Sequence, residues 1–233
     1  MIKIYPRDTL GSADYGWLKA RYHFSFARYI NRDRIGFGTL KVINDDIVKA
    51  GHGFDTHPHD NMEIITFVRK GAITHKDSQG NKGRTAAGDV QVMSAGSGIA
   101  HSEHNAEDED TVLYQIWITP KEKDIPPRWD MAEFPKTPVK DELHLLVSGR
   151  AEDKDKGALY IHQDAAIYGG RIQGGGTITQ AIKHQAYLLV SEGAITVNGQ
   201  AVNAGDGAEI TSMDEISITA KQDAQLLLID VPG

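Results

Sequence analysis

The chain has 233 residues, of which 40% are apolar and 24% are charged, and its formal net charge is −7 at pH 7. This composition is that of an ordinary globular protein, and the negative charge argues against a phosphate-binding surface, so we expect no direct contact with nucleic acid. Cysteine is absent, which excludes disulfides, thiolate metal sites and a cysteine nucleophile. Neither a signal-peptide pattern nor an apolar run of about 20 residues is present, so we expect a cytoplasmic protein with no membrane span.

Short β-branched runs separated by Gly, Asn and Asp recur along the chain and predict an all-β fold. The first two runs are residues 38–45 and 64–68, and residues 77–81 then have the composition of a turn. Residues 112–118 are apolar on both faces, so we expect this strand to lie between two layers. Helical patterns are scarce, and we expect one short helical turn at residues 130–134.

The middle of the chain is rich in proline and charged residues, with five prolines between residues 120 and 138. Such a composition is typical of a domain boundary. We therefore expect a first domain at residues 1–120, a proline-rich linker at 121–142 and a second domain at 143–233.

The two halves resemble each other over a strand, a glycine turn and a second strand. Residues 63–74 (EIITFVRKGAIT) are similar to residues 185–196 (QAYLLVSEGAIT), and an Ala-Gly-Asp triplet follows each segment, at 87–89 and at 204–206. This repeat predicts two copies of one β-barrel unit. Two fused barrels can bury their own apolar faces, so we expect a monomer.

Four of the ten histidines fall in two tight groups: His57-Pro58-His59, with Glu63 four residues later, and His101-Ser102-Glu103-His104. Residues two apart in a strand share a face, so His57 and His59 can converge on one point, as can His101 and Glu103. Three imidazoles and a carboxylate suit Fe(II), Mn, Ni, Cu or Zn. Spacing alone does not choose between Glu63 and Glu103 as the carboxylate ligand.

The alternative is that these histidines are ordinary, partly buried residues. Pro58 cannot donate a hydrogen bond to a neighbouring strand, so the first group could simply be an edge strand or a loop. Two groups that share the same strand spacing favour a metal site over this alternative.

The same segments resemble the two sequence motifs of the cupin superfamily. The pattern from Gly51 to Gly71 is similar to the first motif, with one extra residue before the last glycine, and that from Gly88 to Asn105 is similar to the second, with Ser94 in place of the usual proline and two extra residues before the histidine. Several short segments resemble the pirin family more specifically: DYGW at 14–17, HFSF at 23–26, THPH at 56–59, MEI at 62–64 and HSEHN at 101–105.

The resemblance implies a bicupin, that is, two cupin-type β-barrels in one chain, with a metal in the first barrel alone. It implies that one divalent metal is held by His57, His59, His101 and Glu103, and that Glu63 lies behind the ligands or lines the pocket. Fe(II) is the metal we expect first, and Zn, Mn, Ni or Cu also fit these ligands.

Aligning the two repeats on their glycines predicts that the second barrel lacks metal ligands. The residues expected opposite His57, His59 and Glu63 are Thr179, Ala181 and Gln185, and those opposite His101 and Glu103 are Ile218 and Ala220.

The resemblance further implies a quercetin 2,3-dioxygenase activity, in which O2 opens the central ring of a flavonol and CO is released. The partners would then be a small aromatic substrate and O2. Glu103 or Glu63 would take the proton of the flavonol hydroxyl, and we expect an apolar pocket wall made of Phe24, Phe26, Phe37 and Met93.

Two other functions compete with the dioxygenase. One is a non-enzymatic iron-binding protein that senses redox state or co-regulates transcription through protein partners. The other is a sugar-binding or isomerase cupin, because this superfamily hosts many chemistries. Turnover of quercetin with O2 consumption would favour the dioxygenase.

Overall fold

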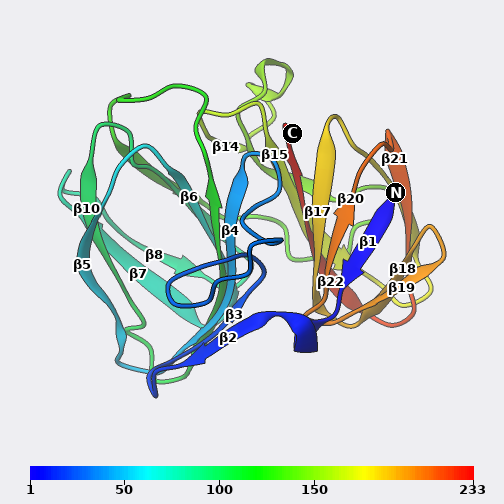
Figure 1. Ribbon diagram of the computed structural model, residues 1–233, viewed down its shortest axis with the longest axis horizontal. Coiled ribbons are helices and arrows are strands. Elements are labelled where there is room, and N and C mark those ends of the chain that lie inside the picture. The colour runs from blue at the N-terminus through cyan, green and yellow to red at the C-terminus, as the bar shows by residue number, and fades with distance from the viewer. The chain divides into compact units, whose positions relative to one another are not determined.

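The computed structural model describes residues 1–233, which divide into two compact units. We call residues 11–134 with 159–163 the N-terminal barrel, and residues 1–10, 135–158 and 164–233 the C-terminal barrel. Each is built almost wholly from antiparallel β-strands (Figure 1). The helical elements are two short 3-10 turns, at Arg7–Thr9 and Ala151–Asp153, and no helix has the length and apolar character needed to cross a membrane.

The N-terminal barrel consists of two facing sheets, with strand orders β12-β9-β6-β11-β4-β3-β2 and β5-β10-β7-β8. Its strands are β2 (Gly11–Asp14), β3 (Leu18–Tyr22), β4 (Leu40–Val48), β5 (Gly53–His59), β6 (Glu63–Lys70), β7 (Ala72–Asp77), β8 (Lys82–Ala86), β9 (Val90–Ser94), β10 (Ile99–His104), β11 (Thr111–Ile118) and β12 (Arg128–Ala132), and the short strand β14 (Leu159–Tyr160) lies in its second segment.

The C-terminal barrel repeats this arrangement, with strand orders β1-β20-β17-β22-β15-β13 and β16-β21-β18-β19. Its strands are β1 (Ile2–Tyr5), β13 (His144–Ser148), β15 (Ala166–Ile172), β16 (Thr177–Ala181), β17 (Gln185–Glu192), β18 (Ala194–Val197), β19 (Gln200–Asn203), β20 (Gly207–Ile210), β21 (Glu215–Ala220) and β22 (Ala224–Val231).

The repeat in the sequence corresponds to a repeat in the structure. Gly71 joins β6 to β7 with φ +71°, and Gly193 joins β17 to β18 with φ +80°, a left-handed conformation that glycine adopts without strain. At the second turn, the backbone N–H of Gly88 donates to Val68 and that of Gly205 donates to Val190, both at 2.8 Å. The predicted all-β fold with two barrels is therefore confirmed.

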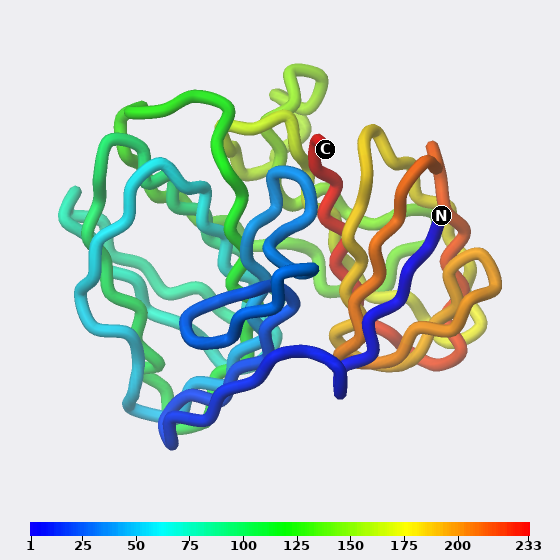
Figure 2. Tube along the Cα trace, in the orientation of Figure 1, coloured from blue at the N-terminus to red at the C-terminus, as the bar shows by residue number.

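The first ten residues lie in the C-terminal barrel, not in the first domain as predicted. Strand β1 pairs antiparallel with β20, with Ile2 opposite Ile210, and Figure 2 shows the two segments side by side, in blue and orange. Ile2 and Ile4 pack against the apolar core of that barrel. Burial of these two side chains, together with the hydrogen bonds to β20, explains why the segment joins the distant sheet.

The predicted helical turn at residues 130–134 is wrong, and the predicted linker 121–142 contains a strand. Strand β12 pairs with β9, placing Trp129 opposite Met93. The Trp129 ring stacks on the ring of His75, with centroids 4.9 Å apart and planes 9° apart. The charge and proline content of residues 121–142 suggested a linker. The contact between Trp129 and His75, which are far apart in the sequence, instead stabilises β12 as an edge strand.

The interior of the C-terminal barrel is filled by an apolar core that includes Ile178, Ile182, Val197, Ile216 and Ile218. Val197 and His75 are equivalent, because each lies four residues after its turn glycine. Ile218 pairs with Val197 and Glu103 pairs with His75, so Ile218 is the counterpart of Glu103. Ile216, two residues earlier, is then the counterpart of His101. The predicted alignment is wrong by two residues on this strand, because the second repeat is two residues shorter between its Gly-Asp turn and β21.

Candidate metal centre

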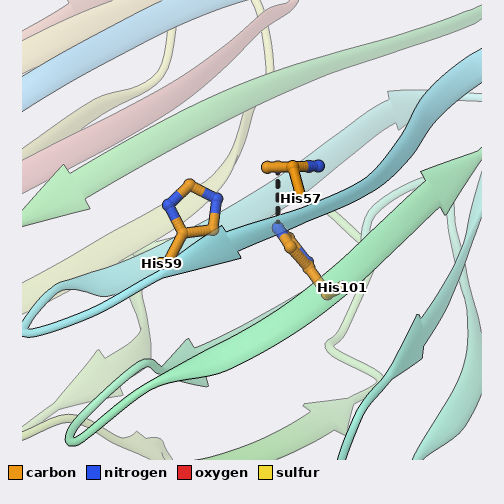
Figure 3. Close-up of side chains that lie close together, drawn as sticks. All are labelled: His57, His59 and His101. Carbon is orange, nitrogen blue, oxygen red and sulfur yellow. Dashed lines mark hydrogen bonds between the residues drawn. The ribbon is translucent and has the colours of Figure 1, made fainter.

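Strand pairing brings the two histidine groups together. Strands β5 and β10 are antiparallel neighbours, and His101 lies directly opposite His57. Their Nε2 atoms are 3.1 Å apart, and the ring nitrogens of His57, His59 and His101 all lie within 4.8 Å of one another. Figure 3 shows the three rings, two from β5 and one from β10, gathered around one point.

The spacing of these nitrogens fits a metal ion. Two neighbouring ligands of an octahedral metal, each bound at about 2.1 Å, lie about 3 Å apart, close to the 3.1 Å between the Nε2 atoms of His57 and His101. The Nδ1–H of His57 donates to the carbonyl oxygen of Asp55 at 2.7 Å. This hydrogen bond leaves the lone pair of Nε2 directed at the site.

His59 and His101 are held in the form that binds metals. Burial, together with repulsion from the neighbouring imidazoles, lowers the pKa of His59 to about 4 and that of His101 to about 3. Both side chains are therefore neutral at pH 7, and a neutral imidazole is the form that coordinates a metal.

A buried pair of residues supports His101 from behind. The Nδ1 atoms of His101 and His75 are 3.4 Å apart, and Nε2 of His75 is 2.9 Å from Oδ2 of Asp77. Since the carboxylate of Asp77 accepts from Nε2–H of His75, Nδ1 of His75 is left as the acceptor for Nδ1–H of His101. This chain of hydrogen bonds leaves the Nε2 lone pair of His101 free to bind a metal.

Glu103 is the carboxylate beside these histidines. One of its oxygens lies within 4.8 Å of a ring nitrogen of both His75 and His101, which makes a second group of potential ligands, and its side chain is buried. Glu103 does not belong to the first group, which consists of His57, His59 and His101. Oε1 accepts hydrogen bonds from Gln91 at 2.6 Å and from Thr66 at 3.2 Å, and Oε2 accepts one from Gln115 at 2.6 Å. The carboxylate is thus fixed in orientation by three polar side chains.

Glu63 lies elsewhere. It is fully buried, but it neither lines the cavity described below nor lies within the two groups of potential ligands. Along β6, Glu63 and Thr66 have opposite parity, so Glu63 faces away from the side of the sheet that holds Glu103. Its Oε2 accepts a hydrogen bond from Ser94 at 2.7 Å. Burial raises the pKa of Glu63 to about 7, although the Ser94 hydroxyl and the His162 backbone oppose this shift.

A cavity of about 500 Å³ adjoins the histidines, and His57, His59 and Glu103 are among its lining residues. Its other walls are mainly aromatic, made by Trp17, Tyr22, Phe26, Phe54 and Trp117. Of the four predicted wall residues, Phe26 is confirmed, whereas Phe24, Phe37 and Met93 are buried away from the cavity. The volume and aromatic walls suit a flat small molecule.

Comparison with known proteins identifies the family. The family model described as Pirin matches residues 4–118, and the one described as quercetinase C-terminal cupin domain matches residues 145–231. The chain belongs to the pirin family. Both barrels are therefore cupin barrels, and the predicted bicupin fold is confirmed.

Relatives of this pirin cover almost the whole chain. A pirin-like protein of Caulobacter vibrioides is 50% identical over 232 residues, which is 99% of each chain. A quercetin 2,3-dioxygenase of Escherichia coli K12 is 40% identical over 235 residues, covering 100% of this chain and 99% of its own. The crystal structure of the Escherichia coli pirin YhhW in complex with nickel(II) matches with a TM-score of 0.91 at 39% identity, covering 100% of this chain and 99% of the other.

Sequence reasoning missed the polar residues that hold Glu103 and His101 in place. Gln91, Thr66 and Gln115 each lie between two apolar residues of a strand, and the cross-strand register sets them in one lateral row. An isolated polar residue within a buried strand was the available signal, because such a group needs a hydrogen-bond partner. For His75 and Asp77, the signal was that they lie two residues apart in the strand that follows Gly71, and so share one face of it.

Proposed function

We propose that this pirin is a metal-dependent dioxygenase that opens a flavonol such as quercetin with O2 and releases CO. The observation that carries the proposal is the group of three histidines beside a cavity with aromatic walls. The name of the Escherichia coli relative, a quercetin 2,3-dioxygenase, supports the same activity.

His57, His59, His101 and Glu103 would hold one divalent metal. Fe(II) suits these ligands, and the nickel(II) complex of the Escherichia coli pirin supports Ni(II) as well. When bound, the metal would act as a Lewis acid toward the 3-hydroxyl group of the flavonol.

The chain's own residues supply orientation and proton transfer. Glu103 lines the cavity and lies beside His101, so it would accept the proton of the flavonol 3-hydroxyl at one of its oxygens. The amides of Gln91 and Gln115 hold that carboxylate in place. Trp17, Phe54, Phe26 and Trp117 pack edge to face in pairs, with centroids 5.2 and 5.6 Å apart, and would hold the flat substrate away from water.

The decisive test combines metal analysis with turnover. We expect protein purified without added ions to contain about one transition metal per chain, and the Fe(II)-loaded or Ni(II)-loaded protein to consume quercetin and O2 with release of one CO per quercetin. His57→Ala should lose both the metal and the activity. One metal per chain without turnover would overturn the dioxygenase and favour a binding or redox-sensing protein.

The two glutamates give a matched pair of variants. We expect Glu103→Gln to weaken metal binding by at least tenfold and to abolish turnover, because it removes the charged oxygen beside His101. Glu63→Gln makes the same chemical change at an equally buried position on the other face of the sheet, so it should leave the metal content intact. Metal retention by Glu103→Gln with the wild-type affinity would overturn the role of Glu103 as a ligand.

A further inference from the structure

A lateral row of polar side chains, one from each of five neighbouring strands, crosses the sheet, and its end made by Gln115, Asn44 and Tyr22 forms the cavity floor. Cross-strand pairing sets Gln91 beside Thr66, Thr66 beside Gln115, Gln115 beside Asn44, and Asn44 beside Tyr22. The first three residues of the row bind the carboxylate of Glu103. Gln115 has no spare amide atom, because its Oε1 accepts from the indole N–H of Trp117 at 2.9 Å.

The next part of the floor has acceptors that nothing in the protein satisfies. Asn44 and Asp46 lie two residues apart on β4, share its inward face and line the cavity. Their exposed fractions are 4% and 2%, and Oδ1 of each has no hydrogen-bond partner within the protein. Buried acceptors without partners destabilise a fold and are rare in native structures, so two adjacent ones at a cavity wall point to a ligand.

The surroundings define the chemistry of that ligand. Two acceptors require hydrogen-bond donors, and the aromatic walls require a flat apolar framework that carries those donors. Burial, with repulsion from Asp45 and Glu103, raises the pKa of Asp46 well above its usual range. A neutral Asp46 offers little attraction to an ammonium group and carries one O–H beside its carbonyl oxygen, so hydroxyl groups, which both donate and accept, fit best.

We propose that Asn44 and Asp46 form a hydroxyl-binding subsite, which exchanges hydrogen bonds with phenolic hydroxyl groups of the substrate other than the one at the metal. The subsite would select polyhydroxylated flavonols over flavonols that carry the 3-hydroxyl alone. This inference rests on the proposed function, since it assumes that a flavonol occupies the cavity.

The test compares two ligands and three variants. Binding of quercetin and of 3-hydroxyflavone, which lacks the additional hydroxyl groups, is measured anaerobically by calorimetry on Ni(II)-loaded protein. We expect Asn44→Leu and Asp46→Leu to weaken quercetin binding about tenfold and 3-hydroxyflavone binding less than twofold. Asn203→Leu makes the same change at an exposed position of the C-terminal barrel and should alter neither affinity.

A second readout is the melting temperature of the metal-free variants. Replacing an unpaired buried acceptor with an apolar group of similar size should leave that temperature unchanged or raise it. A lower melting temperature, or failure of the variants to fold, would show that the acceptors stabilise the free protein and would overturn the subsite.

The remaining outcomes distinguish a failure of the subsite from a failure of the proposed dioxygenase function. Equal weakening of both ligands, or no weakening of quercetin binding, would overturn the subsite while leaving the dioxygenase intact. Failure of wild-type protein to bind either ligand would overturn the proposed function, and the subsite with it.

Discussion

At the scale of single residues, burial of the Glu63 carboxyl group makes the free energy of unfolding depend on pH. Its folded-state pKa of about 7 lies above the ordinary value of 4.5, so the folded protein retains a proton that the unfolded chain releases. The stabilisation it provides is therefore present below about pH 4.5 and is lost as the pH rises to about 7, a change of roughly 3 kcal/mol.

Glu63→Gln should remove this dependence. We expect the variant to exceed the wild type in free energy of unfolding at pH 8, by up to about 3 kcal/mol, and to match it at pH 4 to 5. Urea unfolding at both pH values measures the difference. Glu142→Gln, at an exposed position, is the control and should show no such change; a Glu63→Gln effect that is the same at both pH values would contradict the shifted pKa.

His75 belongs to the same scale, because its effect passes through a single atom of His101. We expect His75→Phe to weaken metal affinity 10- to 100-fold, since the outer hydrogen bond that orients His101 is lost. Phenylalanine keeps an aromatic ring against Trp129 but leaves the Nδ1–H of His101 without its acceptor, so the metal-free protein should fold and melt below the wild-type temperature. Competition with a chromophoric chelator measures the affinity, with the exposed His52→Phe as control. Wild-type affinity in His75→Phe would exclude the relay through Asp77.

At the scale of elements, strand β1 is the informative case. Ile2 and Ile4 pack on the core of the C-terminal barrel, whereas Lys3 between them is exposed. We expect replacing both isoleucines with serine to lower the free energy of unfolding of that barrel by about 1–3 kcal/mol, and Lys3→Ser to have little effect. Hydrogen exchange of the β20 amides measures the change. Metal content should be unaffected, and loss of metal would show that β1 acts on more than its own sheet.

The same elements show what could and could not be predicted from sequence. The strands around Gly71 and Gly193 were predictable, because a glycine turn between apolar runs is a local signal. Strands β1 and β12 were not, since each is an edge strand whose partner lies far away in the sequence. For the site, the two-residue spacing of His57 and His59 was enough to predict that they share a strand face. The face on which Glu63 lies was not predictable, because the motif does not show which residues of β6 point into the barrel.

At the scale of the whole molecule, two barrels of one topology have different interiors. The N-terminal barrel contains a cavity and the buried polar side chains around Glu103, whereas the C-terminal barrel is filled by aliphatic side chains. We expect metal removal to lower the stability of the N-terminal barrel alone, by about 2.7 kcal/mol when the free metal concentration had been 100 times Kd. Hydrogen exchange should then speed up in β5, β7 and β10 and stay constant in β16, β18 and β21. Faster exchange in both barrels would contradict this separation.

The row of polar residues that ends at the cavity floor makes the orientation of Glu103 sensitive to strand slippage. Gln91, Thr66, Gln115 and Asn44 each come from a different strand, and in each strand the adjacent residues face the opposite way. A slip of one residue in any of these strands would turn its polar member out of the barrel and bring in a neighbour from the opposite face. A chain with such a slip keeps an apolar interior but loses hydrogen bonds to Glu103. Metal retention therefore reports whether the strands have paired in the correct register.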